Sequence, residues 1–180
     1  MAASARSAAL EGLKAWRLRG TWPDQFVKKE LPALGLSPKD KGLSVQLLYG
    51  TIQNLQRIDF YIGCYSSVKL RKIMPQVLDC LRLGVYQLVF LQKIPVSAAV
   101  NESVNLAKKA GGARAGGFAN AILRKVASQR ENLPEVTGED APSRMAVYYS
   151  HPLWFVRRMV ALLGEEETCE LLEADNMPPP

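Results

Sequence analysis

The sequence is poor in the residues that build disulfide frameworks and metal centres. Its 180 residues include three cysteines, Cys64, Cys80 and Cys169, and a single histidine, His151. The cysteines are odd in number and far apart, which fits neither a disulfide framework nor a zinc site. We therefore expect no metal site, and a reducing cytoplasm is the simplest environment for this chain.

Long apolar runs and targeting segments are also lacking. The most apolar stretch, Val77 to Leu91, is too short to cross a bilayer and contains Asp79 and Arg82. Met1 to Ala9 has neither the basic start nor the apolar block of a signal peptide. We therefore expect no membrane role. Hydrophobic residues make up 48% of the chain and charged residues 22%, values typical of a globular protein.

No segment of strand length alternates apolar and polar residues, whereas almost every segment has apolar residues three or four positions apart. The pattern predicts an all-α protein of about seven to nine helices. The first helix is expected over Ala5 to Arg19 and a short one around Asp24 to Leu31. A third begins at the capping residue Ser37 and carries one buried stripe that extends to Ile62. The helix that opens at Pro75 is apolar nearly all round, which places it at the centre of a bundle.

Two glycines, Gly50 and Gly84, lie inside predicted helices, where glycine costs about 1 kcal/mol relative to alanine. Because glycine has no side chain, two helices can approach closely where it lies, so we predict a tight crossing of helices at or near these residues. Tolerated sequence drift is the alternative explanation.

The second half of the chain contains several breaks. A helix from Ser97 ends at Gly111-Gly112, and a further helix follows Gly116-Gly117. Leu133 to Pro142 is polar, acidic and rich in turn-forming residues, which indicates a linker. Two helices are then expected, the first opening at Ser150-His151-Pro152 and ending at Gly164, which predicts a C-terminal helical hairpin. His151 is interpreted as a capping or packing residue.

The charges are divided unevenly along the chain. Residues 1–130 contain 20 Lys and Arg against 7 Asp and Glu, a net charge of +13, and residues 131–180 contain 3 against 10, a net charge of −7. A basic body with an acidic tail favours a polyanionic partner for the body. The alternative is that lysines merely solvate the helix surfaces.

Three basic clusters are candidates for contacts with RNA phosphates. The clusters lie in the first helix, in a loop before Pro75, and beside the glycine-rich segment 111–117. Such contacts give affinity and salt dependence without sequence readout. The candidate residues are Arg6, Lys14, Arg17, Lys69, Arg71, Lys72, Lys108, Lys109 and Arg114.

The glycine-rich segment itself does not resemble a nucleotide-binding loop, because it follows a helix and no Gly-Lys-Ser/Thr closes it. We interpret it as a flexible helix–helix turn. Free N–H groups at the start of the next helix, beside Lys108, Lys109 and Arg114, could still hold a backbone phosphate.

Four polar residues near apolar stripes are predicted to form an internal hydrogen-bond network rather than a catalytic site. Asn101 and Glu102 lie on one helix, and Asn120 and Arg124 share a face of another. We expect Glu102 to bond to Asn120 or Arg124. No histidine or second carboxylate lies near Glu102 in the sequence to support catalysis.

Four segments of the body and the C-terminal tail together have a recognisable pattern. The segments are Lys39–Gly42 through Leu48–Thr51, Leu81–Leu88, Ile94-Pro95 with Ala98–Glu102, and Gly117–Arg124, and the tail is Ser150–Trp154 through Glu173–Asn176 with Pro178–Pro180. They resemble the N-terminal NusB-like domain of bacterial RsmB/Sun-type ribosomal RNA cytosine-C5 methyltransferases and, more distantly, the transcription antitermination factor NusB. The tail resembles the connector that leads into the next subdomain of the methyltransferase, which NusB itself lacks.

The resemblance implies two packed three-helix bundles and binding to ribosomal RNA. It implies a NusB-like RNA-binding domain over residues 1–132, a linker over 133–142, and a helical connector over 143–180. It also implies that the parent enzyme uses S-adenosylmethionine and two cysteines in a downstream domain. This chain has no glycine-rich cofactor loop after a strand and no Pro-Cys pair, so we expect no bound cofactor and no activity of its own.

Thr168-Cys169 resembles part of the methyltransferase active site but lies in the glutamate-rich segment Glu165 to Glu170. Negative charge around the thiol disfavours the thiolate that a nucleophile needs, so we reject Cys169 as a catalytic residue.

Two other functions stay open. The chain could be a free-standing NusB-like antitermination factor that pairs with a small-subunit ribosomal protein and RNA. It could also be a helical protein-binding module whose lysines serve only solubility.

Overall fold

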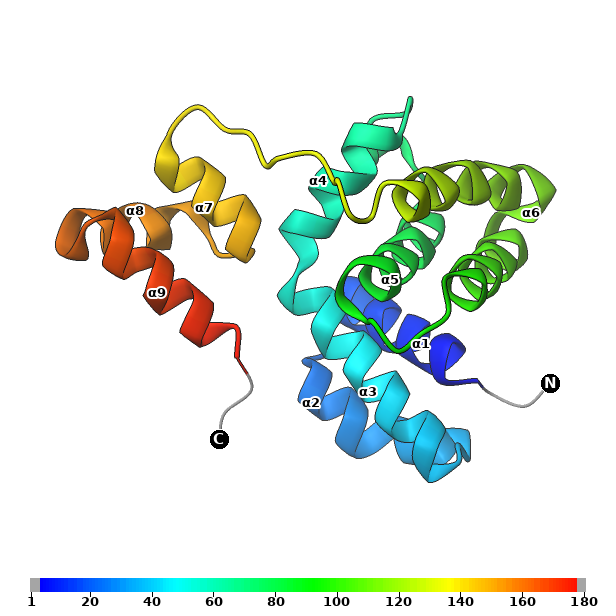
Figure 1. Ribbon diagram of the computed structural model, residues 1–180. Coiled ribbons are helices and arrows are strands. Elements are labelled where there is room, and N and C mark those ends of the chain that lie inside the picture. The colour runs from blue at the N-terminus through cyan, green and yellow to red at the C-terminus, as the bar shows by residue number, and fades with distance from the viewer. Residues whose placement is uncertain (1–3, 178–180) are drawn as a thin grey trace.

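The computed structural model describes residues 4–177, which form helices and no strand, so the prediction of an all-α fold is confirmed. Helices α1 to α6 make up a body, and α7 to α9 form a C-terminal unit at its side (Figure 1). Met1–Ala3 and Pro178–Pro180, the latter part of the predicted connector, lie outside the described residues.

Helix α1 (Ala5–Arg19) has the bounds that the sequence predicts. The Ser4 side chain caps its start by accepting a hydrogen bond from the N–H of Ser7, and Gly20 ends it at a φ of 64°. The buried face of α1 consists mainly of small residues. A Cβ atom at Gly12 would lie 2.8 Å from Leu48, so the missing side chain lets α1 pack closely on its neighbour.

The segment after α1 is helical, as predicted, but extends further and is less regular than expected. It consists of α2 (Pro23–Gln25), a π-helical turn η1 (Phe26–Glu30) and a 3₁₀ turn η2 (Leu31–Leu34). Phe26 and Leu31 are buried in the core, so this segment is part of the body.

The helix predicted from Ser37 through Ile62 is divided in two. Helix α3 (Pro38–Gln53) ends at Asn54, and α4 (Leu55–Tyr65) begins directly after it. The Asn54 amide donates a hydrogen bond of 2.9 Å to the Gly50 carbonyl oxygen. The Asn54 N–H donates to the same oxygen at 3.1 Å, and Asn54 itself leaves the helical conformation, with φ −107° and ψ 21°, as is common for asparagine at the end of a helix.

Helix α5 (Pro75–Phe90), preceded by the 3₁₀ turn η3 (Leu70–Lys72), lies at the centre, as predicted. Eleven of its sixteen residues are buried, and it packs against α1, α3, α4 and α6. Buried apolar residues of the body, from α1 to α6, therefore form a single hydrophobic cluster.

Gly50 and Gly84 lie at close contacts, as predicted, but side chains rather than backbones fill the space. A Cβ atom at Gly50 would lie 2.0 Å from the Tyr86 ring, and one at Gly84 would lie 2.7 Å from Leu123. Each glycine therefore leaves the space that a large side chain from a neighbouring helix fills.

Helix α6 (Val96–Ser128) is a helical hairpin rather than one straight helix. Gly111 and Gly112 have non-helical torsion angles within it. In a continuous helix, residues eight apart would be separated by about 12 Å along the axis. A Cβ atom at Gly116 would instead lie 3.0 Å from the Lys108 Cβ atom. The chain therefore reverses between an N-terminal half (96–110) and a C-terminal half (113–128).

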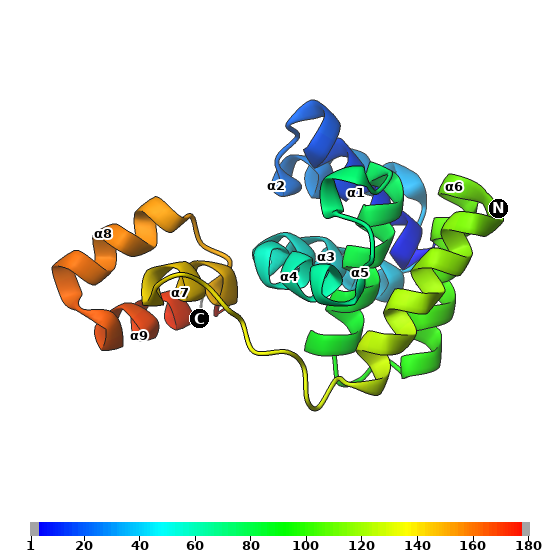
Figure 2. The same ribbon diagram turned by 90° about the horizontal axis from the view of Figure 1, so that it is seen from above.

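The body divides into two groups of helices, as predicted, but only the first is a three-helix bundle, because the hairpin of α6 gives the second group four helices, and both groups share one core. The first group contains α1, the segment 23–34 and α3, and the second contains α4, α5 and the α6 hairpin (Figures 1 and 2). No helix within residues 4–177 has the length and apolar character needed to cross a membrane.

The C-terminal unit contains three helices where the sequence predicted a hairpin. Helices α8 (Leu153–Leu163) and α9 (Glu165–Asp175) form the expected hairpin, and α7 (Ala141–Tyr149) adds a third helix. Ala146, Val156 and Leu172, one from each helix, form a small core that is separate from that of the body.

The unit is attached to the body along α4 by hydrogen bonds. The Gln56 amide donates to the His151 carbonyl oxygen at 2.9 Å, and the Arg57 N–H donates to Ser150 Oγ at 3.2 Å. His151 is a packing residue, since its ring stacks on that of Phe155 with centres 6.0 Å apart, and its ring nitrogens also lie 2.8 Å from the Tyr149 carbonyl oxygen and 2.8 Å from Asp175 Oδ2. Between body and unit, residues 129–140 contain no helix.

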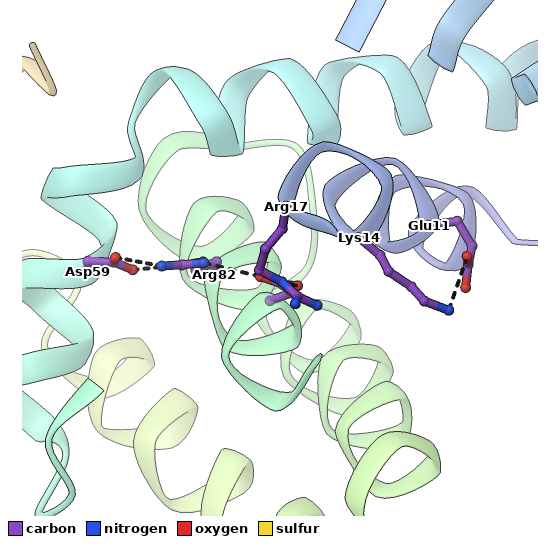
Figure 3. Close-up of polar contacts among 6 residues, drawn as sticks. Glu11, Lys14, Arg17, Asp59 and Arg82 are labelled. Atoms are coloured by element: carbon purple, nitrogen blue, oxygen red, sulfur yellow. Dashed lines mark hydrogen bonds and ion pairs between the residues drawn. The ribbon is translucent and has the colours of Figure 1, made fainter. Parts of the chain in front are cut away.

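One buried carboxylate joins three helices of the body (Figure 3). Asp79 of α5 accepts hydrogen bonds from Arg17 of α1 at 2.9 Å and from Arg82 at 3.1 Å, and Arg82 also binds Asp59 of α4 at 2.7 Å. The Asp79 side chain is only 3% exposed. A charge so buried is tolerated because two cations neutralise it.

We predict that Asp79→Ala lowers the free energy of unfolding by about 3 kcal/mol, because it leaves Arg82 and Arg17 without their shared partner in the protein interior. Urea unfolding measures this change. The matched control is Glu30→Ala, which removes an exposed pair with Arg19 and should cost at most about 1 kcal/mol. Equal midpoints for the two variants would contradict the structural role of Asp79.

Candidate nucleic-acid interface

Two of the predicted basic clusters meet at a hollow between α1 and the α6 turn. The hollow has a volume of about 330 Å³, and Lys14 of α1 and Lys109 of α6 both line it. Lys14 makes only an exposed contact of 3.7 Å with Glu11, a pair that contributes little in water. Glu11 and Asp79 also line the hollow, but Asp79 is already bound by Arg17 and Arg82, so both ammonium groups stay available to an anion.

The remaining basic cluster lies on the other side of the same turn. Lys72 and Arg114 line a second hollow, of about 280 Å³, whose walls include Met74 and Phe118. Lys69 and Arg71 are exposed beside Lys72. Two cations beside an apolar wall can hold a phosphate while a base or another flat group contacts the wall.

The reversal of α6 brings these residues together. A Cβ atom at Gly111 would lie 3.2 Å from both Met74 and Val77, so the turn packs directly on the start of α5. Ala110 borders the first hollow and Gly111 the second. We use the name turn cluster for Lys14, Lys72, Lys108, Lys109 and Arg114, of which Lys108 is exposed on the N-terminal half of α6.

Two predicted RNA-binding residues have internal partners instead. Arg17 is bound to Asp79, and Arg6 donates a hydrogen bond of 2.7 Å to Gln87, which is 1% exposed. Gln87 also lies 3.5 Å from Ser103 Oγ. These arginines stabilise the packing of α1 on α5, and we leave them out of the candidate interface.

The predicted polar network forms only in part. Arg124 donates a hydrogen bond of 3.1 Å to Asn120 within α6. Asn101 and Glu102 are exposed, and neither bonds to Asn120 or Arg124 within residues 4–177. The buried polar residue of this helix is the next one, Ser103. Its partner Gln87 lies on α5, so the network that ties the helices differs from the predicted one.

The environments of two cysteine thiols, Cys80 and Cys64, disfavour the thiolate form. Burial and the nearby Asp79 raise the pKa of Cys80 to about 12, and burial also raises the pKa of Cys64 above its ordinary value. Thr168 is buried and donates its hydroxyl to the Gly164 carbonyl oxygen at 2.6 Å, as expected of a residue that supports a helix.

Comparison with a solved structure first identifies the type of fold. The solved structure of T. maritima NusB has a TM-score of 0.60 and 27% sequence identity to this chain, and the match covers 72% of this chain and 91% of that one. The fold of the body is therefore the fold of NusB.

The family model for the NusB family matches residues 3–128, so the chain belongs to the NusB family. The probable ribosomal RNA small subunit methyltransferase B of Bacillus subtilis is 33% identical over 98% of this chain. The transcription antitermination protein NusB of Hahella chejuensis is 30% identical over 70% of this chain and 85% of its own length. The chain spans 39% of the length of the Bacillus methyltransferase.

The sequence did not identify three arginines that the fold brings into one hollow, Arg57, Arg130 and Arg144. Each is isolated in the sequence, and Arg130 and Arg144 flank the predicted linker. The count of charges gave no signal for Arg144, because residues 131–180 are acidic, and Arg57 and Arg130 lie in the basic region but outside its three clusters.

We predict that Gly112→Ala destabilises the fold by about 1–3 kcal/mol, because Gly112 has φ 76° and ψ −171°, a conformation that other residues rarely adopt. Thermal unfolding measures the loss. Gly117→Ala is the control, because Gly117 is helical and a Cβ atom there would meet nothing within 4 Å. That variant should be stabilised by about 0.5–1 kcal/mol. A neutral Gly112→Ala would show that the reversal does not depend on this glycine.

Proposed function

We propose that this chain is the RNA-binding part of a ribosomal RNA cytosine-C5 methyltransferase. In this role it helps to position ribosomal RNA for a catalytic domain that uses S-adenosylmethionine. The observation that carries the proposal is the turn cluster: cations from three separate segments of the sequence meet at one turn. Phosphate contacts need this kind of convergence, whereas lysines that serve only solubility have no reason to converge.

The extent of the sequence match favours a methyltransferase over a free-standing factor. The match to the Bacillus methyltransferase includes the C-terminal unit, whereas the match to the Hahella NusB covers only 70% of the chain. Under this proposal, residues 1–132 form the RNA-binding domain, 133–142 the linker and 143–180 the connector.

The surface of the C-terminal unit supports its role as a connector. Trp154 is 69% exposed and Leu162 is 67% exposed, and both belong to α8. Apolar side chains this large on a helix surface are typical of a face that another domain covers. We propose the catalytic domain of the parent enzyme as that neighbour.

S-adenosylmethionine does not fit the residues described here. Nucleoside cofactors of this kind bind beside glycine-rich loops that follow strands, and residues 4–177 contain no strand. The cofactor and the two catalytic cysteines would belong to the catalytic domain. No chemical step is assigned to this chain.

The second candidate is a free-standing antitermination factor in the cytoplasm that pairs with a small-subunit ribosomal protein. The match to the Hahella NusB over 85% of that protein favours it. Pull-down of purified small-subunit proteins by the 180-residue chain separates the two candidates. Stable recovery of one ribosomal protein supports the factor, and recovery of none supports the methyltransferase.

We predict that Lys109→Gln with Arg114→Gln weakens binding of a single-stranded RNA and lowers its salt dependence. Removing two phosphate contacts should reduce the slope of log K against log salt by about 1.4, since each contact on a single strand contributes about 0.7. Fluorescence anisotropy with a labelled ribosomal RNA fragment, titrated at several salt concentrations, measures both quantities.

The control for this experiment is Lys125→Gln with Arg158→Gln. It removes the same charge from two exposed positions outside the turn cluster. The control should retain nearly the full slope. Equal losses in the two double variants would show that only net charge matters, and salt-independent binding would favour the protein-binding module.

A further inference from the structure

A third hollow lies between the body and the C-terminal unit. It has a volume of about 560 Å³, is open to solvent, and is lined by residues of α4, the segment 130–136 and α7. We use the name arginine–tyrosine hollow for it, because its lining includes Arg57, Tyr61, Arg130, Arg144, Tyr148 and Tyr149. This volume lies in the range of small-molecule sites.

Arg57 is a cation held by aromatic rings rather than by a carboxylate. Its guanidinium carbon lies 3.9 Å from the centre of the Tyr148 ring and 5.4 Å from that of Phe90. Its Nε donates to the Tyr61 hydroxyl at 3.0 Å. Within residues 4–177, Arg57 forms no ion pair with a carboxylate, and the bond to Tyr61 is the one hydrogen bond that its guanidinium group makes. A half-buried cation with unbonded donors is suited to an anion or a carbonyl oxygen.

The other two arginines of the hollow are similarly available. Arg144 is exposed and forms no ion pair within the described residues. Arg130 makes only an exposed contact of 3.8 Å with its neighbour Glu131. Such surface pairs contribute little, so both guanidinium groups can bind a phosphate.

The tyrosines and glutamates of the hollow indicate which groups the ligand carries besides a phosphate. Tyr148 is 43% exposed and forms a T-shaped pair with Tyr149, with ring centres 5.0 Å apart. Exposed aromatic and guanidinium planes are the surfaces on which unpaired bases stack. Glu131 and Glu135 also line the hollow, and their carboxylates can accept hydrogen bonds from the amino groups of a base.

We propose that the arginine–tyrosine hollow binds one nucleotide of single-stranded RNA, with the base against the Arg57–Tyr148 stack and the phosphate between Arg130 and Arg144. The proposal rests on the proposed function only in taking RNA as the ligand. The site is distinct from the turn cluster and shares no residue with it. It requires α7, so it exists only where the C-terminal unit is present.

The experiment compares Arg144→Gln with Arg158→Gln in the full 180-residue chain. Both residues are exposed, and each variant loses one charge, but only Arg144 lines the hollow. With a labelled 12-nucleotide RNA, Arg144→Gln should weaken binding about three- to tenfold and lower the salt slope by about 0.7. Arg158→Gln should leave the slope unchanged. Equal slopes for the two variants would overturn the proposal.

A cross-linking measurement provides a second readout that does not depend on affinity. The same RNA carrying 4-thiouridine is irradiated with the protein, and the linked peptides are identified by mass spectrometry. Links to residues 130–136 or 142–149 support the proposal. Links confined to the segments around Lys72 and Lys108–Arg114 would overturn it and leave the proposed function intact.

Two further outcomes are informative. If an acidic peptide of equal charge competes with the RNA at the hollow as well as unlabelled RNA does, the hollow binds anions of any kind and the nucleotide assignment fails. If neither Arg144→Gln nor the Lys109 and Arg114 double variant changes binding, both this proposal and the proposed function fail together.

Discussion

A helix that is apolar on nearly every side must be covered by other helices on nearly every side, and this requirement on α5 organises the body. Its buried residues face α1, α3, α4 and both halves of α6, so none of these elements can be removed without exposing the core. Asp79 shows how strict the requirement is, because a carboxylate in this position is stable only with Arg17 and Arg82 beside it. Two of the cations that the sequence offers are therefore used inside the protein.

The reversal of α6 at Gly111-Gly112 follows from the same requirement. The two halves of α6 cover two sides of α5, and the sharp return of the chain uses a conformation at Gly112 that other residues rarely adopt. The turn places Lys109 and Arg114 beside the start of α5, and α1 and η3 bring Lys14 and Lys72 to the same place. The packing of the core and the assembly of the turn cluster thus have one cause.

What the sequence predicted well depends on local periodicity, and what it missed depends on tertiary contacts. The bounds of α1, the central position of α5 and the presence of close contacts at Gly50 and Gly84 follow from spacing and residue size, although the sequence predicted close helix backbones there and the structure has large side chains. The break at Asn54 does not, because an asparagine inside an apolar stripe gives no clear signal of which carbonyl it will bind. The sequence also gave no hint of the partners of Arg6 and Arg17. In the sequence, a cation on the surface cannot be distinguished from one with a buried partner. Only the fold places Asp79 beside Arg17 and Gln87 beside Arg6.

The two proposed RNA sites lie at opposite ends of one rigid element. The turn cluster surrounds the start of the C-terminal half of α6, and Arg130 follows its end at Ser128. Sixteen helical residues separate these ends by roughly 24 Å. At a stacked spacing of roughly 3.4 Å per nucleotide, a single strand of about seven nucleotides would join them.

A strand of that length would bind at both ends at once, and the second contact would benefit from the high effective concentration that the first creates. Weak contacts of the kind that arginine and lysine make with phosphates could then combine into useful affinity. Because the second site needs α7, such cooperation would be confined to chains in which the C-terminal unit is joined to the NusB body.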